Sequence, residues 1–158
     1  MAYQKLQAYR ALAVIPSDTI DIPGVSGPLL SSATDGVAAT NKLVDSTVNF
    51  GTNGVSSGDI VYNTTTATGV ATVTDVDDAN TLSLSADIMA SGEDYTIFVN
   101  SPNPGCVLYS GAGGDIKVRT AGGDDVTLAG TAAGAFLPLQ VVRVFATPAP
   151  PAGIIAMW

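Results

Sequence analysis

The first candidate for chemistry is a repeated triplet of glycine and aspartate in the last third of the chain. Gly-Gly-Asp occurs at residues 113–115 and again at residues 122–124. This nine-residue spacing matches the period of calcium-binding β-roll repeats, which follow the pattern Gly-Gly-x-Gly-x-Asp. At least about three such repeats must stack to enclose a core, and the chain offers two imperfect copies. We therefore interpret the triplets as two turns that flank a strand at residues 116–120.

The strand between the triplets, "IKVRT", predicts which side chains enter the core. Alternation with period two places Ile116 and Val118 inward and Lys117 and Arg119 outward. On this interpretation the triplets form a hairpin, and their aspartates are not metal ligands.

A second candidate metal site is the aspartate-rich segment "DVDDANT" at residues 75–81. When Asp75 is taken as the first position of a helix-loop-helix calcium loop, the third ligand falls on Ala79 and the bidentate glutamate on Ala86. Asn80 stands where that loop requires glycine. Because strand-like segments lie on both sides, the sequence predicts a hairpin turn here.

Catalysis by paired carboxylates is the next chemistry to consider. Three acidic pairs are adjacent in sequence: Asp77 and Asp78, Glu93 and Asp94, and Asp124 and Asp125. Adjacent side chains on a strand point to opposite faces, so such neighbours do not make a glycosidase pair. The chain has no histidine, which removes Ser-His-Asp triads and the common zinc ligand sets. We therefore expect no enzyme activity, and we assign no catalytic, cofactor-binding or metal-binding residue.

Four further residues carry side chains that recur in binding or catalytic sites. Tyr62, Tyr95 and Tyr109 offer a platform for sugar rings, although tyrosines at period-two positions more often pack a sheet. Cys106 is the only cysteine and has no histidine to activate it, so we expect a buried small apolar side chain.

The composition narrows the classes of partner. Charged residues make up only 13% of the 158-residue chain, and six basic residues against fourteen acidic ones give a formal charge of −8. With no basic run, we expect neither a nucleic-acid partner nor binding to an anionic membrane. No apolar run is long enough to span a bilayer and no signal peptide is evident, so we expect synthesis in a cytoplasm.

The N-terminal quarter of the chain is weakly patterned. Residues 1–12 hold tyrosines and basic side chains at a loosely helical spacing, which fits a frayed end, a short helix or an arm that docks on a neighbouring subunit. Residues 13–24 carry two prolines and suit an edge strand. Residues 25–41 show no strong period and are predicted as loop.

The rest of the chain predicts short strands separated by turns. The strands expected before the breaker "NSPNPG" lie at residues 60–63, 70–76, 81–88 and 94–99. Those expected after it lie at residues 106–111, 115–120, 125–130, 136–147 and 154–158. Because the chain finishes on Met157 and Trp158, we expect its end to lie inside the sheet.

Two blocks of the sequence resemble known families when they are taken as wholes. The segments "ALAVIPSDTIDIP", "CVLYSGAGGDIKVRTAGGDDVTLAGTAAGAFLPLQVVRVFAT" and "GIIAMW" resemble the head spike base protein family of gene transfer agents and related tailed phages. These segments cover about half the chain. The block between them, from "NKLVDST" to "DYTIF", resembles a small β module common in phage virion proteins, particularly those of cyanophages.

These resemblances imply an all-β fold with a split base domain at residues 13–24 and 104–158. The base is expected to be a split antiparallel β-sandwich or barrel. The inserted module, residues 25–103, is expected to be a small antiparallel barrel-like structure, and residues 1–12 an N-terminal arm.

The implied function is structural, on the outer surface of a phage head. The expected partners are the major capsid protein, other copies of the chain as a trimer (or a pentamer at a vertex), and a spike or fibre protein. The resemblance leaves two positions open, as a cement protein in the capsid lattice or as the base of a vertex spike. An alternative is a glycan-binding module whose exposed loops or tyrosines contact the host surface.

Overall fold

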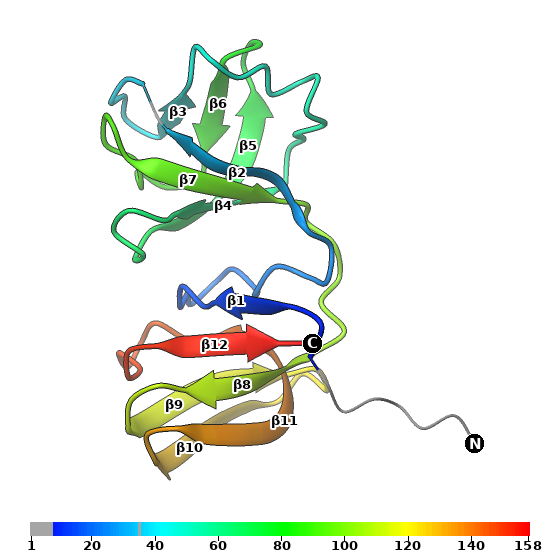
Figure 1. The fold of residues 1–158 in the computed structure, drawn as a ribbon, viewed down its shortest axis with the longest axis vertical. Helices are drawn as coiled ribbons and strands as arrows, with labels where there is room; N and C mark the ends of the chain where they lie inside the picture. Colours follow the sequence, from blue (N-terminus) through cyan, green and yellow to red (C-terminus); the bar gives the residue numbers. More distant parts are fainter. Residues whose placement is uncertain (1–7, 35) are drawn as a thin grey trace, which may run out of the picture. The chain divides into compact units, whose positions relative to one another are not determined.

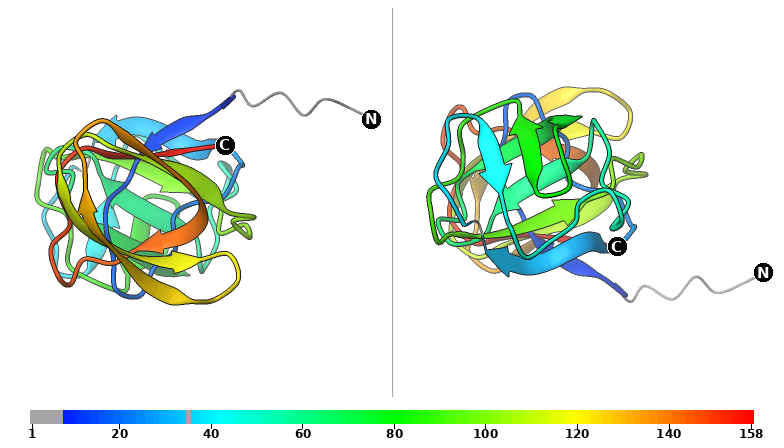
Figure 2. Two further views of the ribbon diagram at one scale, coloured as in Figure 1. Left: turned by 90° about the horizontal axis from the view of Figure 1, so that it is seen from below. Right: turned by 90° about the horizontal axis from the view of Figure 1, so that it is seen from above.

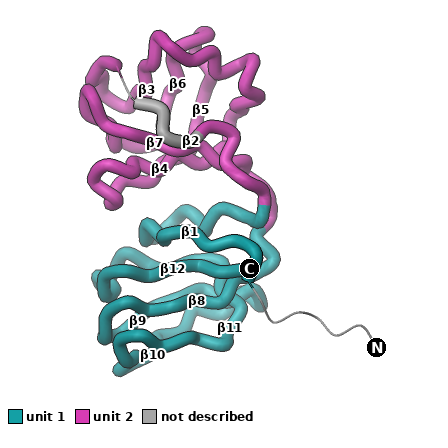
Figure 3. Tube along the Cα trace, viewed as in Figure 1, with its two compact units in different colours: residues 1–25, 103–158 teal, residues 26–102 magenta. Residues whose placement is uncertain are grey.

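The computed structural model describes residues 8–34 and 36–158, and within these residues the fold is all-β with no helix (Figure 1). The chain forms two compact units (Figure 3). Unit 1 combines the residues up to Val25 with Asn103–Trp158, and unit 2 is Ser26–Pro102. The split expected from the sequence, with breaks after residues 24 and 103, differs from these bounds by one residue at each join.

Unit 1 is one antiparallel sheet of six strands in the order β1-β12-β8-β11-β9-β10. The strands are β1 (Ala11–Ala13), β8 (Cys106–Ser110), β9 (Gly114–Thr120), β10 (Asp125–Thr131), β11 (Ala135–Val144) and β12 (Ile154–Met157). Figure 2 shows how strongly these strands curve. Their inward side chains and Ile22, from the segment after β1, enclose a core made of Ile22, Cys106, Leu108, Ile116, Val118, Val141, Val144, Ile154 and Ala156.

Unit 2 is a second antiparallel sheet of six strands, in the order β2-β7-β4-β5-β6-β3. The strands are β2 (Pro28–Thr34), β3 (Lys42–Val44), β4 (Ile60–Asn63), β5 (Val70–Val76), β6 (Thr81–Leu84) and β7 (Asp94–Phe98). The unit has a core of its own, made of Leu43, Phe50, Val55, Val61, Ala71, Val73, Leu82, Leu84, Met89, Tyr95 and Ile97. Each unit thus buries its own apolar face.

The expected all-β antiparallel class is confirmed; of the two alternatives for the base, the open sheets are consistent with a sandwich and not with a closed barrel. The outermost strands of unit 1, β1 and β10, do not pair with each other, and neither do β2 and β3 in unit 2. In unit 1 the segment after β1 bonds the end of β11 instead, through Ser17 N to Val144 O at 2.9 Å and Ile22 N to Val142 O at 2.8 Å. Each sheet therefore keeps two edges.

Three sequence predictions are corrected by the strand bounds. Residues 25–41 are not all loop, because Pro28–Thr34 forms β2, which pairs with β7. Two register shifts interrupt this pairing, so the residues of β2 do not follow a period-two pattern. The strand expected at 81–88 ends at Leu84, which leaves Ala86 exposed. The edge strand expected at 13–24 is instead β1, so residues 11 and 12 belong to the sheet and not to an arm.

Both chain-end predictions bear on unit 1. β12 lies between β1 and β8, so the expectation that the chain finishes inside the sheet is confirmed. Residues 8–10 are not helical. The remainder of the predicted arm, residues 1–7, lies outside the described residues.

Candidate functional site

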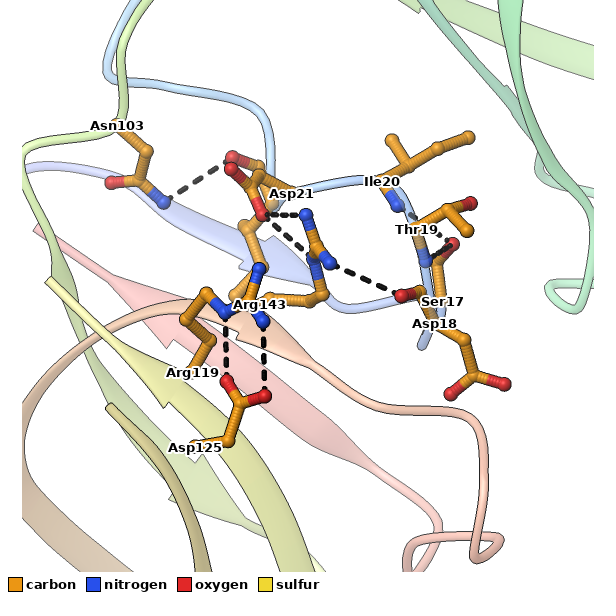
Figure 4. A network of polar contacts seen from close by, with 10 residues as sticks. Ser17, Asp18, Thr19, Ile20, Asp21, Asn103, Arg119, Asp125 and Arg143 are labelled. Carbon is orange, nitrogen blue, oxygen red and sulfur yellow. Dashed lines mark hydrogen bonds and ion pairs between the residues drawn. The ribbon is translucent and has the colours of Figure 1, made fainter. Parts of the chain in front are cut away.

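The polar side chains of unit 1 gather where the segment after β1 crosses the end of β11 (Figure 4). Ser17 makes the turn that starts this segment, because its Oγ accepts hydrogen bonds from the backbone N–H of Thr19 at 3.3 Å and of Ile20 at 3.0 Å. This local turn presents the backbone carbonyl of Asp18 and the carboxylate of Asp21 to one side chain of β11.

That side chain is Arg143, which is only 13% exposed as a whole. Its Nε and Nη2 both lie 2.7 Å from Asp21 Oδ1, and its Nη1 donates to Asp18 O at 3.1 Å. Planar guanidinium groups suit such multiple contacts. Arg143 therefore connects the segment after β1 to β11.

A second arginine stands directly across the strand pair. Arg119 of β9 is the register partner of Arg143, and like charges in that position repel. Arg119 donates to Asp125 from Nε at 2.7 Å and from Nη2 at 2.9 Å. These hydrogen bonds lower the pKa of Asp125 below its usual range and raise that of Arg119. Each arginine thus has its own aspartate.

The ring of Phe145 lies beneath this network. Lys117 Nζ is 4.5 Å from the ring centroid, and the guanidinium carbons of Arg119 and Arg143 are 5.7 and 5.9 Å away. Cations over an aromatic face are attracted to it, and their aliphatic stems cover apolar surface. Phe145 is buried, and three of the six basic residues of the chain are used to cover it.

The segment after β1 is also attached to the residues that follow β11. The carboxylate of Asp18 accepts hydrogen bonds from Thr147 N at 3.0 Å and from Thr147 Oγ1 at 2.8 Å. The hydroxyl bond is the main reason that the pKa of Asp18 is lowered. Ser17 and Asp18, two residues of the segment "ALAVIPSDTIDIP", are therefore structural parts of the network.

A clamp holds the two points at which the chain leaves and re-enters unit 1. Asn103 donates from Nδ2 to Ile22 O at 3.2 Å, and its Oδ1 accepts from Trp158 Nε1 at 3.2 Å. The guanidinium of Arg10 donates to Gly24 O and lies 5.1 Å from the Trp158 ring. Residues next to both joins are thus tied to each other and to the end of β12.

Unit 2 carries an open pocket of about 490 Å³. Its lining residues are Asn63, Thr66, Thr68, Gly69, Asp87, Ile88, Met89, Ala90 and Glu93. Asn63 is buried and donates to Ile88 O and to Glu93 Oε2, each at 2.7 Å. Hydroxyl, amide and carboxylate groups therefore line the pocket together with three apolar side chains.

The two charge classes are divided unevenly between the units. By sequence, unit 1 contains five basic and five acidic residues, whereas unit 2 contains one lysine and nine acidic residues. The lysine, Lys42, lies 2.6 Å from Asp77 Oδ2. The whole formal charge of −8 thus belongs to unit 2.

The second Gly-Gly-Asp triplet and residues 77–80 form turns, as expected, whereas Gly114 and Asp115 of the first triplet belong to strand β9, so that triplet is not a hairpin turn. Residues 121–124 connect β9 and β10, with Gly123 at φ 96° and its N–H bonded to Thr120 O at 3.0 Å. Asp115 accepts from Gly130 N at 2.8 Å. Residues 77–80 connect β5 and β6, and Asp77 there accepts from Lys42 and Ser83, which lower its pKa. Within the described ranges 8–34 and 36–158, no group of three or more metal-ligating side chains occurs.

The members of each acidic pair have different surroundings. Asp125 binds Arg119, whereas its neighbour Asp124 is exposed. Asp77 binds Lys42, whereas Asp78 accepts a hydrogen bond from Asn80 N at 2.8 Å. Glu93 Oε2 accepts from Ala90 N at 2.7 Å, whereas Asp94 is exposed.

The tyrosine and cysteine predictions are largely resolved by burial. Tyr62 and Tyr95 are buried, so they pack the sheet and cannot form an exposed sugar platform, whereas Tyr109 is partly exposed beside Phe136. Cys106 is buried, as expected, and donates from Sγ to Val141 O at 3.1 Å. Burial raises the pKa of its thiol to about 12, so little thiolate forms at neutral pH.

Sequence reasoning missed the arginine network and the clamp. The alternation in "VVRVF" could have placed Arg143 and Phe145 on one face of a strand. No local signal identifies the partner Asp21, because it lies 122 residues away along the chain.

No family model, curated protein or solved structure matches the chain. In the part of the chain that the structure describes, no helix is long and apolar enough to span a membrane.

Proposed function

We propose that the chain is a structural protein of a tailed-phage virion, located on the outer surface of the head. It acts there as a cement protein or as the base of a vertex spike, and it stabilises the shell through contacts repeated by symmetry. Its partners are the major capsid protein, other copies of the chain, and a spike or fibre protein. It is made in the host cytoplasm and needs no catalytic group or cofactor.

The observation that supports this proposal is the joining of the motif segments within unit 1. Asp18 of the segment "ALAVIPSDTIDIP" binds Thr147, and Asp21 of the same segment binds Arg143. Arg143 and Thr147 both belong to the segment that ends "VVRVFAT". Arg119 and Asp125, from the glycine-aspartate hairpin, complete the network. The segments that resemble the spike base family are thus parts of one folded unit, which is what a base domain split by an insertion requires.

The electrostatics favour a structural role over an acid-base one. The pKa values of Asp18, Asp77 and Asp125 are all lowered, because hydroxyl or cationic groups stabilise the ionised carboxylates. A general acid at neutral pH needs the opposite shift. These aspartates instead hold loops and strands together.

The test is the composition of purified virions. Virions from cells that carry this gene should contain the chain at a fixed ratio to the major capsid protein, measured by quantitative mass spectrometry. Particle images should show its density on the outside of the head. If the chain is absent from washed particles while it is abundant in the lysate, the proposal is wrong.

The second candidate function, glycan binding by unit 2, is favoured by one observation. The pocket beside Asn63 combines the hydroxyl groups of Thr66 and Thr68 with carboxylates and the apolar surface of Ile88 and Met89. Sugars are bound by such mixtures of hydrogen-bonding and apolar groups. The version in which Tyr62 and Tyr95 stack on sugars is excluded by their burial.

A glycan array probed with the chain tests this candidate. The candidate is supported if the chain binds host surface polysaccharide and Thr66→Val weakens that binding. Thr64→Val, outside the pocket, should have no effect. If the chain binds no glycan on the array but is still present in virions, only the structural role remains.

A further inference from the structure

The outward face of the unit 1 sheet carries a continuous apolar surface over four strands. The register places Phe136 opposite Tyr109, Tyr109 opposite Ile155, and Ile155 opposite Ala13. Two residues further along the strands, Val107, Met157 and Ala11 form a second row. Directly opposed residues share a face, so these seven side chains form one surface, which we call the outer apolar face.

Phe136 is the most prominent side chain of the outer apolar face. It is 67% exposed, and its ring meets that of Tyr109 edge-on with a centroid distance of 5.3 Å. Phe145 of the same strand region is only 7% exposed, because three basic side chains lie over it. The sequence thus covers one outward phenylalanine and leaves the other in solvent.

A pocket of about 360 Å³ adjoins this surface. Val107 and Met157 belong to both the pocket and the outer apolar face, and the pocket is also lined by Tyr9, Val25 and Trp158. Of the six large apolar side chains that are exposed within the described residues, four lie here: Tyr9, Val25, Val107 and Phe136. Such a concentration of exposed apolar surface is typical of an interaction site.

We propose that the outer apolar face is the contact between two copies of this chain, with Phe136 of each copy inserted into the pocket of the other. The projecting side chain and the pocket lie on one face, so a two-fold axis can satisfy both at once. Aromatic side chains that fill pockets are the usual anchors of protein interfaces.

Given that copies of the chain associate, the charge distribution favours the outer apolar face as the surface between them. None of the seven side chains of the outer apolar face is charged, and the unit that carries them has equal numbers of acidic and basic residues. Contact through unit 2 would bring together two units that each carry a formal charge of −8, and these units would repel each other. Two copies therefore meet with the least electrostatic cost through unit 1.

The contact through the outer apolar face rests on the proposed function only for the premise that copies of the chain associate. Beyond that function, it specifies the surface through which two copies meet. The reciprocal geometry gives pairs of copies, in place of the trimer that the resemblance led us to expect.

The isolated chain provides the test, because Trp158 is its only tryptophan and lines the pocket. Sedimentation should show a concentration-dependent dimer, and tryptophan emission should shift to shorter wavelength along the same curve. Phe136→Ser should weaken the dimer by about 100-fold, since each of two buried rings contributes at least about tenfold. Val25→Asp, on the pocket side, should weaken it as well.

The matched control is Val37→Ser, which removes an exposed apolar side chain of unit 2 and should leave the dimer unchanged. Circular dichroism would show that each variant is folded. A strictly monomeric wild-type chain, or a dimer that Phe136→Ser and Val25→Asp leave intact, would overturn the inference. If virions nevertheless contain the chain, the proposed function still holds, so failure of this inference is distinguishable from failure of the proposed function.

Discussion

Arg119 and Arg143 stand directly opposite each other in neighbouring strands of unit 1, and each is bound by a different aspartate. A like-charged cross-strand pair opposes sheet formation on its own. Asp125 comes from the adjacent strand, whereas Asp21 comes from the segment after β1. Neutralising the pair therefore couples the pairing of β9 and β11 to the docking of that distant segment.

Removal of Asp21 should destabilise unit 1. Asp21→Ala leaves Arg143, whose side chain is 13% exposed, beside Arg119 with no carboxylate of its own. Loss of this charge-assisted hydrogen bond should lower the free energy of unfolding by about 1–2 kcal/mol. The loss is no larger because Asp21 is half exposed, and solvent weakens the interaction. Urea unfolding followed by Trp158 fluorescence reports on this unit. Asp124→Ala, an exposed neighbour outside the network, is the control, and equal effects of the two variants would contradict the coupling.

The stability of unit 1 should fall in acid. The folded-state pKa of Asp125 is lowered, chiefly by its hydrogen bonds to Arg119, so the unfolded chain binds a proton first as the pH falls. The stabilising contribution is complete above the ordinary aspartate pKa of about 3.9 and is lost as the pH drops through the folded value. The difference in melting temperature between wild type and Asp125→Asn should be largest near neutral pH and vanish in strong acid. A difference that is independent of pH would show that the pair contributes no ionic stabilisation.

Gly69 is a position where a methyl group should be costly. A Cβ added there would lie 2.9 Å from Ile88 Cβ and 3.3 Å from both Asn63 Cβ and Ile88 O. Overpacking of this kind costs about 1–3 kcal/mol. We expect Gly69→Ala to lower the melting temperature of unit 2, measured by calorimetry. Gly27→Ala in the same unit is the matched control, because an added Cβ there meets nothing within 4 Å.

Salt should strengthen the association of two copies. The units that carry the formal charge of −8 repel each other, and salt screens that repulsion within about 10 Å at 0.1 M. The apolar contact through Phe136 contains no ion pair that salt could weaken. Dimer dissociation constants from sedimentation should therefore fall as salt rises. A rise would indicate that attraction between opposite charges holds the copies together.

The sequence predicts the parts of the fold that depend on local alternation. Ile116 and Val118 face the core of unit 1, as their period-two spacing predicts, and the second Gly-Gly-Asp triplet follows their strand as a turn. The first triplet overlaps the strand, which begins at Gly114. Alternation fails at β2, where two register shifts interrupt the pairing with β7. A bulge changes which face a side chain occupies without leaving a mark in the local sequence.

The candidate site is less predictable because its contacts are distant in sequence. Arg143 reaches Asp21 over 122 residues, and Asp18 reaches Thr147 over 129. The outward placement of Lys117 and Arg119 was predictable, yet their position over Phe145 depends on how β9 and β11 align. Pairing between strands, and not pattern within them, decides these contacts.

The clamp at Asn103 has a consequence for engineering. Its side chain bonds Ile22 O at 3.2 Å, so the last residues before unit 2 and the first residue after it are already held together. A short flexible linker from Gly24 to Asn103 would therefore close unit 1 without disturbing its core. Conversely, other sequences could be grafted at this point, which makes unit 1 a natural scaffold for displaying foreign peptides.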